Sequence, residues 1–269
     1  MLNIHPSAVI DKRARVADSA TIGAYAVIEG ETIIEDGVVI EPYAHICPGA
    51  ILRKDCKICS FCTISGLPQD LHFDISIPTY AEIGERTVVR EGTTVHRATF
   101  EGKSTIVGKD CLLMVNSHLG HDTRLGDRVI LASFSAVAGH STVDDDTFIS
   151  GGVMVHQKVR IGCGCMVSGN SAFSKDIAPY VNAYERNDMA GLNLIGLMRR
   201  KTPREAIANL KQLYAAVFSG GNPRKNAQAA MDGGLVKSRE GEKFVRFFTD
   251  APEGRHFLTP RRRKDFEQL

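Results

Sequence analysis

The chain has 269 residues, of which 43% are hydrophobic and 24% are charged. This composition is ordinary for a globular protein, and it excludes a disordered tail or a collagen-like rod. At roughly 150 residues per domain, the length predicts one or two domains. No apolar run reaches the roughly 18 residues that span a bilayer, and the first residues lack the basic and apolar regions of a signal peptide. We therefore expect a cytoplasmic protein with no transmembrane segment.

Charge is distributed unevenly along the chain. The net charge is +2, but residues 1–190 carry 17 Lys and Arg against 23 Asp and Glu, whereas residues 191–269 carry 16 against 8. A basic C-terminal part could meet phosphates, nucleic acid, a membrane or an acidic protein. Aromatic residues make up only 7% and Trp is absent, which argues against a base-stacking surface and a nucleic-acid partner.

Aliphatic residues recur every six positions through the first two thirds of the chain. The series runs from Ile4 to Ile64 without a gap, resumes at Ile83, and continues from Val107 to Phe173. A period of six differs from the 3.6 of a helix and indicates a repeated unit of strand plus turn. Three such units make one triangular coil with the aliphatic residue inside, and successive coils stack as parallel strands about 4.8 Å apart.

The expected fold is therefore mainly β, with a parallel β-helix over residues 1–190 and a helical domain over residues 191–269. Hexapeptide repeats of this kind resemble the left-handed parallel β-helix family, and the left hand is implied by that resemblance only. Two interruptions of the period predict loops that protrude near residues 65–82 and 96–104. Such insertions often lie on the binding face of a solenoid.

The C-terminal part has helix signals. Thr202 as N-cap, Pro203 in the first turn and Glu205 of a capping box predict the start of a helix. One face of this helix would carry four apolar residues, Ile207, Leu210, Tyr214 and Val217. Further helices are expected from Pro223 to Met231 and from Ser238 to Phe248.

Three histidines, His121, His140 and His156, follow one another at intervals of 19 and 16, close to one coil. They should lie in a row on one edge, with Asp122 beside the first. A neutral imidazole oriented by a carboxylate can take a proton from an attacking hydroxyl or amine. Three imidazoles can instead bind zinc and activate water, as in the carbonic anhydrases with this fold. The zinc alternative leaves the basic C-terminal part unexplained.

An ordered set of motifs covers nearly the whole chain. The motifs are Gln69-Asp70-Leu71, Val95-His96-Arg97, Asn116-Ser117-His118-Leu119-Gly120-His121-Asp122, Ala138-Gly139-His140, Val155-His156-Gln157, and Gly191-Leu192-Asn193 with Arg199-Arg200. In this order they resemble the UDP-N-acetylglucosamine acyltransferase family of lipid A biosynthesis.

The resemblance implies transfer of an (R)-3-hydroxyacyl group from acyl carrier protein to the sugar 3-position of UDP-N-acetylglucosamine, or to the amine of its 3-amino analogue. It makes His121 the general base, Asp122 its orienting partner and the Gly139 N–H an oxyanion donor. No cofactor or metal is implied, because the thioester is already electrophilic. The family is trimeric, with each site between neighbouring prisms.

The resemblance also assigns substrate contacts. Gln69 and Asp70 would hold the sugar. The cleft would be lined by His118, His140, His156 and Gln157. Asn193, Arg199 and Arg200 would approach the nucleotide phosphates, where guanidinium groups are physically apt. Gly169 falls at the family's acyl-chain ruler and would leave room for a longer chain, and the basic run Arg261-Arg262-Arg263-Lys264 could contact the acidic carrier protein.

Three positions depart from the family pattern. His72 and Met198 stand where lysines are common, and Ile195 stands where a glutamate is common. An isoleucine can neither donate nor accept a hydrogen bond, so contacts to the acceptor are expected to differ. A non-enzymatic hexapeptide protein with a decayed site is a further alternative, against which the intact His121-Asp122, Asp70 and Gly139 argue.

Overall fold

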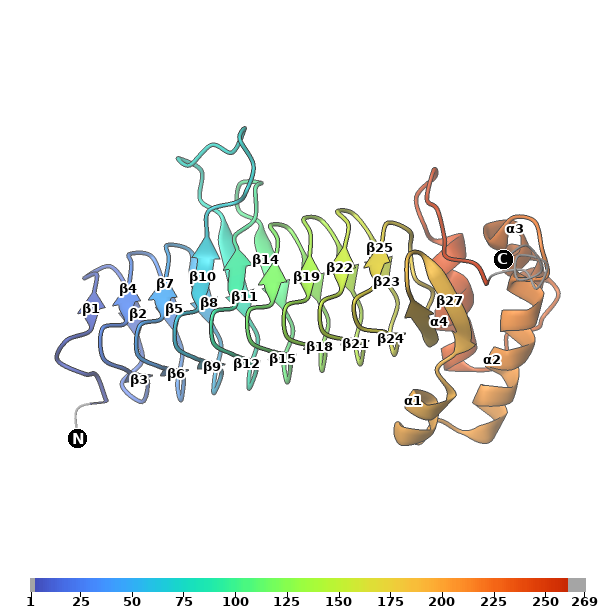
Figure 1. The fold of residues 1–269 in the computed structure, drawn as a ribbon, viewed down its shortest axis with the longest axis horizontal. Helices are drawn as coiled ribbons and strands as arrows, with labels where there is room; N and C mark the ends of the chain where they lie inside the picture. Colours follow the sequence, from blue (N-terminus) through green and yellow to red (C-terminus); the bar gives the residue numbers. More distant parts are fainter. Residues whose placement is uncertain (1–2, 261–269) are drawn as a thin grey trace.

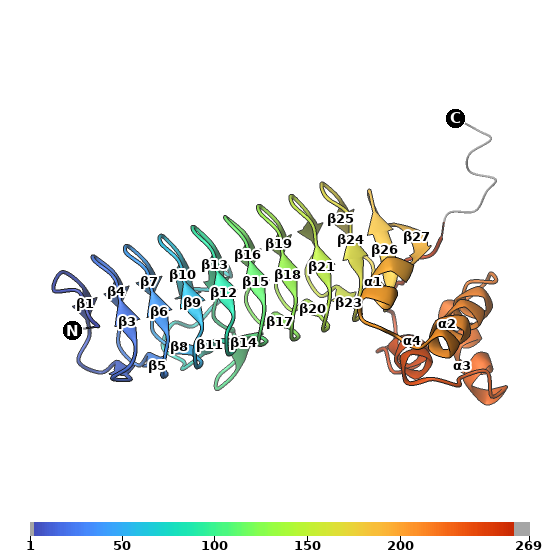
Figure 2. The same cartoon turned by 90° about the horizontal axis from the view of Figure 1, so that it is seen from below.

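The computed structural model describes residues 3–260, in which three sheets, parallel except for the last strand of the third, wind into a triangular prism with helices at its C-terminal end (Figures 1 and 2). Sheet one contains β1 (Val9–Ile10), β4 (Val27–Ile28), β7 (His45–Ile46), β10 (Thr63–Gly66), β13 (Thr94–His96), β16 (His118–Leu119), β19 (Ala136–Val137), β22 (Met154–Val155) and β25 (Ala172–Phe173). Sheet two contains β2 (Arg15–Val16), β5 (Ile33–Ile34), β8 (Ala50–Leu52), β11 (Tyr80–Ile83), β14 (Ser104–Val107), β17 (Arg124–Leu125), β20 (Thr142–Val143) and β23 (Arg160–Ile161). Sheet three contains β3 (Thr21–Ile22), β6 (Val39–Ile40), β9 (Lys57–Ile58), β12 (Val88–Val89), β15 (Leu112–Leu113), β18 (Ile130–Leu131), β21 (Phe148–Ile149), β24 (Met166–Val167), β26 (Val181–Tyr184) and β27 (Asp188–Leu192).

The six-residue period places one aliphatic residue of each strand inside the prism. Leu119 of β16 pairs with Val137 of β19, which pairs with Val155 of β22. These side chains are at most 4% exposed. Burying a Val or Leu side chain stabilises the fold by roughly 1.5–3 kcal/mol. Because this contact repeats along the axis, the interior of the prism is one continuous hydrophobic core.

The chain turns a corner between sheets, which defines three edges. The first edge joins sheet one to sheet two, the second joins sheet two to sheet three, and the third joins sheet three to sheet one. Both protruding loops, residues 67–79 between β10 and β11 and residues 97–103 between β13 and β14, rise from the first edge (Figure 1). This is the edge that also carries His121, His140 and His156, so the insertions gather beside the histidine row.

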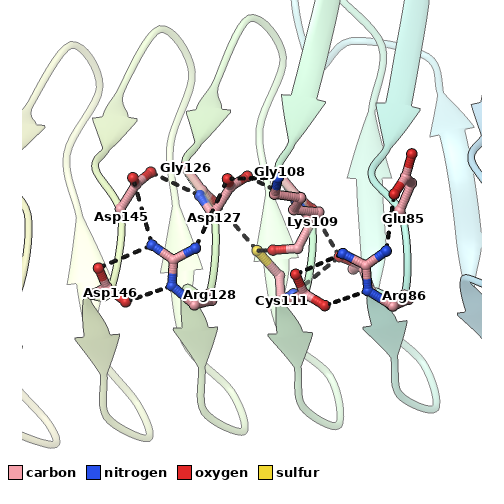
Figure 3. A network of polar contacts seen from close by, with 12 residues as sticks. Glu85, Arg86, Gly108, Lys109, Cys111, Gly126, Asp127, Arg128, Asp145 and Asp146 are labelled. Atoms are coloured by element: carbon pink, nitrogen blue, oxygen red, sulfur yellow. Dashed lines mark hydrogen bonds and ion pairs between the residues drawn. The ribbon is translucent and has the colours of Figure 1, made fainter. Parts of the chain in front are cut away.

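The second edge carries a ladder of ion pairs across successive coils (Figure 3). Arg128 Nε lies 2.7 Å from Asp146 Oδ1, and Arg86 Nε lies 2.7 Å from Asp110 Oδ1. Solvent screens exposed pairs of this kind, so the ladder adds little stability beside the aliphatic core.

The C-terminal part begins with an antiparallel pairing of β26 with β27, followed by α1 (Leu194–Arg199), α2 (Arg204–Val217), α3 (Pro223–Asp232) and α4 (Arg239–Thr249). The three predicted helices are confirmed as α2, α3 and α4. The predicted N-cap Thr202 is wrong, because Pro203 is itself the extended residue before the helix, with φ −55° and ψ 145°. The sequence did not predict α1 or the β26–β27 pair. None of the helices within residues 3–260 is long and apolar enough to cross a membrane.

Candidate active site

His121 and Asp122 lie in the turn that follows β16 on the first edge. His121 Nδ1 lies 2.8 Å from Asp122 Oδ2, and the two side chains are only 16% and 10% exposed. Asp122 occupies the left-handed turn position of its coil, with φ 58°, a conformation that Asp adopts more readily than most residues. The carboxylate fixes the ring through Nδ1, and this leaves Nε2 as the ring nitrogen available to a substrate.

Two threonines hold Asp122, one through its carboxylate and one through its backbone. Thr99, in the loop after β13, donates from Oγ1 to Asp122 Oδ2 at 2.7 Å and from its backbone N–H to the same carboxylate. The backbone N–H of Asp122 donates to Thr105 Oγ1 at 2.8 Å. Neither threonine is recognisable as a site residue from the sequence. Its one signal was the interruption near residues 96–104, which is the segment that delivers Thr99.

Gly139 and His140 come from the next coil and face His121. A Cβ at Gly139 would lie 2.7 Å from both Cε1 and Nε2 of the His121 ring, so glycine alone leaves room for the imidazole. The rings of His121 and His140 meet edge to face, with centroids 4.9 Å apart. His140 Nδ1 lies 3.7 Å from Asp122 Oδ2. The structure thus brings together His121, Asp122, Gly139 and His140.

A second pair of histidines adjoins this cluster, with His118 in β16 three residues before His121 and His96 in β13 one coil toward the N-terminus. His96 and His118 meet edge to face with centroids 4.9 Å apart, and His118 Nδ1 lies 2.7 Å from Thr94 Oγ1. Burial lowers the pKa of His118, and burial together with the neighbouring histidines lowers the pKa of His96 to about 4. Both rings are therefore neutral at pH 7. The sequence analysis quoted His96 within a motif but did not assign it a site role.

His156 and Gln157 lie on the same edge one coil beyond His140, and both are exposed. The His156 ring contacts the carbonyl of Gln157, with Nδ1 3.2 Å from the oxygen. The ligating atoms that converge around His121 belong to Asp122 and His140, all within 4.8 Å of one another. A metal at this place would therefore use Asp122, and not the predicted third histidine.

Other predicted contacts lie apart from this cluster within one chain. Gln69 and Asp70 are exposed in the loop after β10 on the first edge, where Asp70 Oδ1 accepts from the backbone N–H of His72 at 2.9 Å. Gly169 is exposed on the third edge, in the turn after β24.

Asn193, Arg199 and Arg200 lie at the second edge near the last coil. Asn193 caps α1 by accepting from Gly196 N–H, and its amide donates to Gly164 O at 3.0 Å. Arg199 is exposed, and the Arg200 guanidinium lies 6.0 Å from the ring centroid of Tyr180. The predicted site residues are thus distributed over all three edges of the prism. The basic run at residues 261–264 lies outside the described residues.

Comparison with known proteins matches two parts of the chain to family models. Residues 31–66 match the bacterial transferase hexapeptide model, and residues 176–256 match the second domain of UDP N-acetylglucosamine O-acyltransferase. The acyl-[acyl-carrier-protein]–UDP-N-acetylglucosamine O-acyltransferase of Campylobacter concisus is 33% identical over 223 residues, which are 82% of this chain and 85% of that protein. The chain belongs to this acyltransferase family.

Solved structures of the UDP-N-acetylglucosamine acyltransferase family agree with the fold. The protein from Campylobacter jejuni is 31% identical with a TM-score of 0.87, over 96% of this chain and 100% of that one. The protein from Bacteroides fragilis is 32% identical with a TM-score of 0.88, over 94% of this chain and 99% of that one. The predicted left-handed parallel β-helix with C-terminal helices is confirmed.

Proposed function

We propose that this acyltransferase transfers an (R)-3-hydroxyacyl group from acyl carrier protein to the 3-hydroxyl of UDP-N-acetylglucosamine, the first step of lipid A biosynthesis, in the cytoplasm. Membership of the family supports the reaction class. The observation that carries the mechanism is the largely buried His121–Asp122 pair packed against Gly139. This arrangement has a base, a group that orients the base and an adjacent backbone N–H.

His121 acts as the general base in this mechanism. Its Nε2 takes the proton from the sugar hydroxyl while the hydroxyl oxygen attacks the thioester carbonyl. Asp122 stabilises the imidazolium that results, and the N–H of Gly139 donates to the oxyanion. The tetrahedral intermediate then expels the thiolate of the carrier protein, which receives the proton from His121. Gains of about 10²–10⁴ in rate are typical of such a base.

A complete site requires more than one chain, and we propose a homotrimer. The base lies on the first edge, Gly169 on the third and Arg200 on the second, so no single chain gathers them. Contact between the edges of neighbouring prisms would bring an acyl-chain site beside the base. Sugar contacts are assigned to Gln69 and Asp70.

The other predicted site residues contact different parts of the substrates. His118, His140, His156 and Gln157 line it in this proposal, and Arg199 with Arg200 meets the phosphates. Because Asn193 is engaged in capping α1, it acts mainly by holding the helix that presents this arginine pair. The excess of positive charge in residues 191–269 is complementary to the charge of the acidic carrier protein.

Mass spectrometry of products tests the proposal. The protein is incubated with mixed 3-hydroxyacyl carrier-protein thioesters and with UDP-N-acetylglucosamine or its 3-amino analogue, with and without a metal chelator. An acylated UDP-N-acetylglucosamine that is labile to base is the expected product, and its mass gives the chain length. A base-stable amide formed only with the analogue would show N-acylation instead. Loss of activity in chelator, with recovery on adding zinc, would contradict the metal-free mechanism.

A further inference from the structure

A second cluster of ligating side chains lies on the first edge, in the N-terminal half of the prism. Glu29 follows β4, and His45 and Cys47 flank the buried Ile46 of β7. The strands pair Val27 with His45 and Ile28 with Ile46, so Glu29 and Cys47 occupy matching positions in adjacent coils. Parallel stacking at about 4.8 Å therefore brings an oxygen, a nitrogen and a sulfur ligand to one place.

The ligand atoms of these three residues converge. His45 Nε2 lies 2.6 Å from Glu29 Oε1 and 3.7 Å from Cys47 Sγ, and all three atoms are within 4.8 Å of one another. Tetrahedral zinc with its usual bond lengths to S, N and O holds these atoms about 3.3–3.6 Å apart. Side-chain movements of about 1 Å or less would thus enclose an ion.

The surroundings of the cluster leave it open to solvent, and their charges allow its ligands to balance a divalent cation. The three residues line a cleft of about 650 Å³ beneath the loop of residues 67–79, and Glu31 and Arg97 line the same cleft. The charges of Glu31 and Arg97 offset one another, so a Glu29 carboxylate and a Cys47 thiolate would together balance a 2+ ion. The side chains of His45 and Glu29 are 44% and 42% exposed, which leaves a path from solvent.

The thiol holds its proton in the metal-free protein. Burial and the charge of Glu29 raise the pKa of Cys47 to about 11.

We propose that Glu29, His45 and Cys47 form a binding site for a zinc-class divalent cation, with the fourth coordination position open to the cleft. Imidazole, thiolate and carboxylate together are a ligand set that zinc accepts, and zinc held by three protein ligands leaves the fourth position to water or another small ligand. The site is separate from His121, because β10 and β13 lie between β7 and β16 in sheet one. It takes no part in the acyl transfer proposed above.

Cobalt titration of the reduced, metal-free full-length protein tests the site. Thiolate ligation gives Co²⁺ a near-ultraviolet charge-transfer absorption, whereas binding at His121, Asp122 and His140 would give none, because that cluster has no sulfur. We expect the absorption to saturate at one ion per chain and to disappear on adding zinc. Cys47→Ser should abolish it, and Glu29→Gln should weaken cobalt binding at least about tenfold while keeping the thiol.

Cys59 provides the matched control. Its thiol lies near Glu41 and Glu91 with ligand atoms within 4.8 Å, so it is the competing sulfur site among the described residues. Cys59→Ser should keep the absorption. No absorption in the unmodified protein, or absorption that survives in Cys47→Ser and is lost in Cys59→Ser, would overturn the proposal. Circular dichroism of each variant checks the fold, and an unfolded Cys47→Ser variant leaves Glu29→Gln to decide.

Discussion

Gly139 lies so close to His121 that a Cβ at this position would be 2.7 Å from the imidazole Nε2. The backbone of Gly139 does not have a positive φ, so alanine is compatible with its conformation and only the ring must move. We expect Gly139→Ala to lower kcat at least about 100-fold, because a displacement near 1 Å at a catalytic group can have this effect. The thermal unfolding midpoint should change little. A near-normal kcat in a folded variant would show that the packing of these residues is unimportant for the reaction.

Thr99 should act through Asp122. Thr99→Val removes the 2.7 Å hydrogen bond to Oδ2 but keeps the backbone N–H that also donates to the carboxylate. We expect kcat to fall about tenfold with little change in KM, and Asp122→Ala to have a larger effect that still falls short of His121→Ala. Steady-state kinetics and pH–rate profiles of the three variants give this order. An effect of Thr99→Val confined to KM would contradict a positioning role.

The features that the sequence predicts depend on local residue patterns, whereas the features that it does not predict depend on contacts between residues far apart in the chain. The six-residue period is local, so it predicts which residues of each strand are buried and that His121 and His140 share an edge. The contact of Thr99 with Asp122 joins residues 23 positions apart across a loop, and no pattern in the sequence reports it. Likewise, pairing of β26 with β27 depends on β24, against which β26 packs in parallel.

Folding stability should decline in mild acid because His96 is partly buried and neutral. Burial lowers the pKa of His96 from 6.5 to about 4, so the unfolded chain binds a proton more readily than the folded chain. The contribution of His96 is therefore fully present above pH 6.5 and is lost as the pH falls toward 4. His96→Gln removes this titration, and its thermal midpoint should drop less than that of the unmodified protein between pH 7 and pH 5. Equal drops would contradict the prediction.

The length of the acyl group that the enzyme prefers should depend on Gly169. This residue is exposed on the third edge, and a Cβ there would lie 3.2 Å from Gly151 O, a tight contact that a backbone shift of a few tenths of an ångström relieves, and 3.8 Å from Ser150 Cβ. A methionine can therefore extend from the prism into an adjoining acyl groove. We expect Gly169→Met to shift the preferred donor to a shorter acyl group in competition between thioesters. An unchanged preference would remove Gly169 as the ruler.

The general base is tested most directly by comparing turnover of His121→Ala with that of His5→Ala. His5 is exposed near the start of the prism, so its variant controls for loss of a histidine as such. With (R)-3-hydroxyacyl-loaded acyl carrier protein and UDP-N-acetylglucosamine at saturation, His121→Ala should lose about 10²–10⁴ in rate while His5→Ala retains normal turnover. Retention of near-normal turnover by a folded His121→Ala variant would contradict the mechanism and assign the base to another residue.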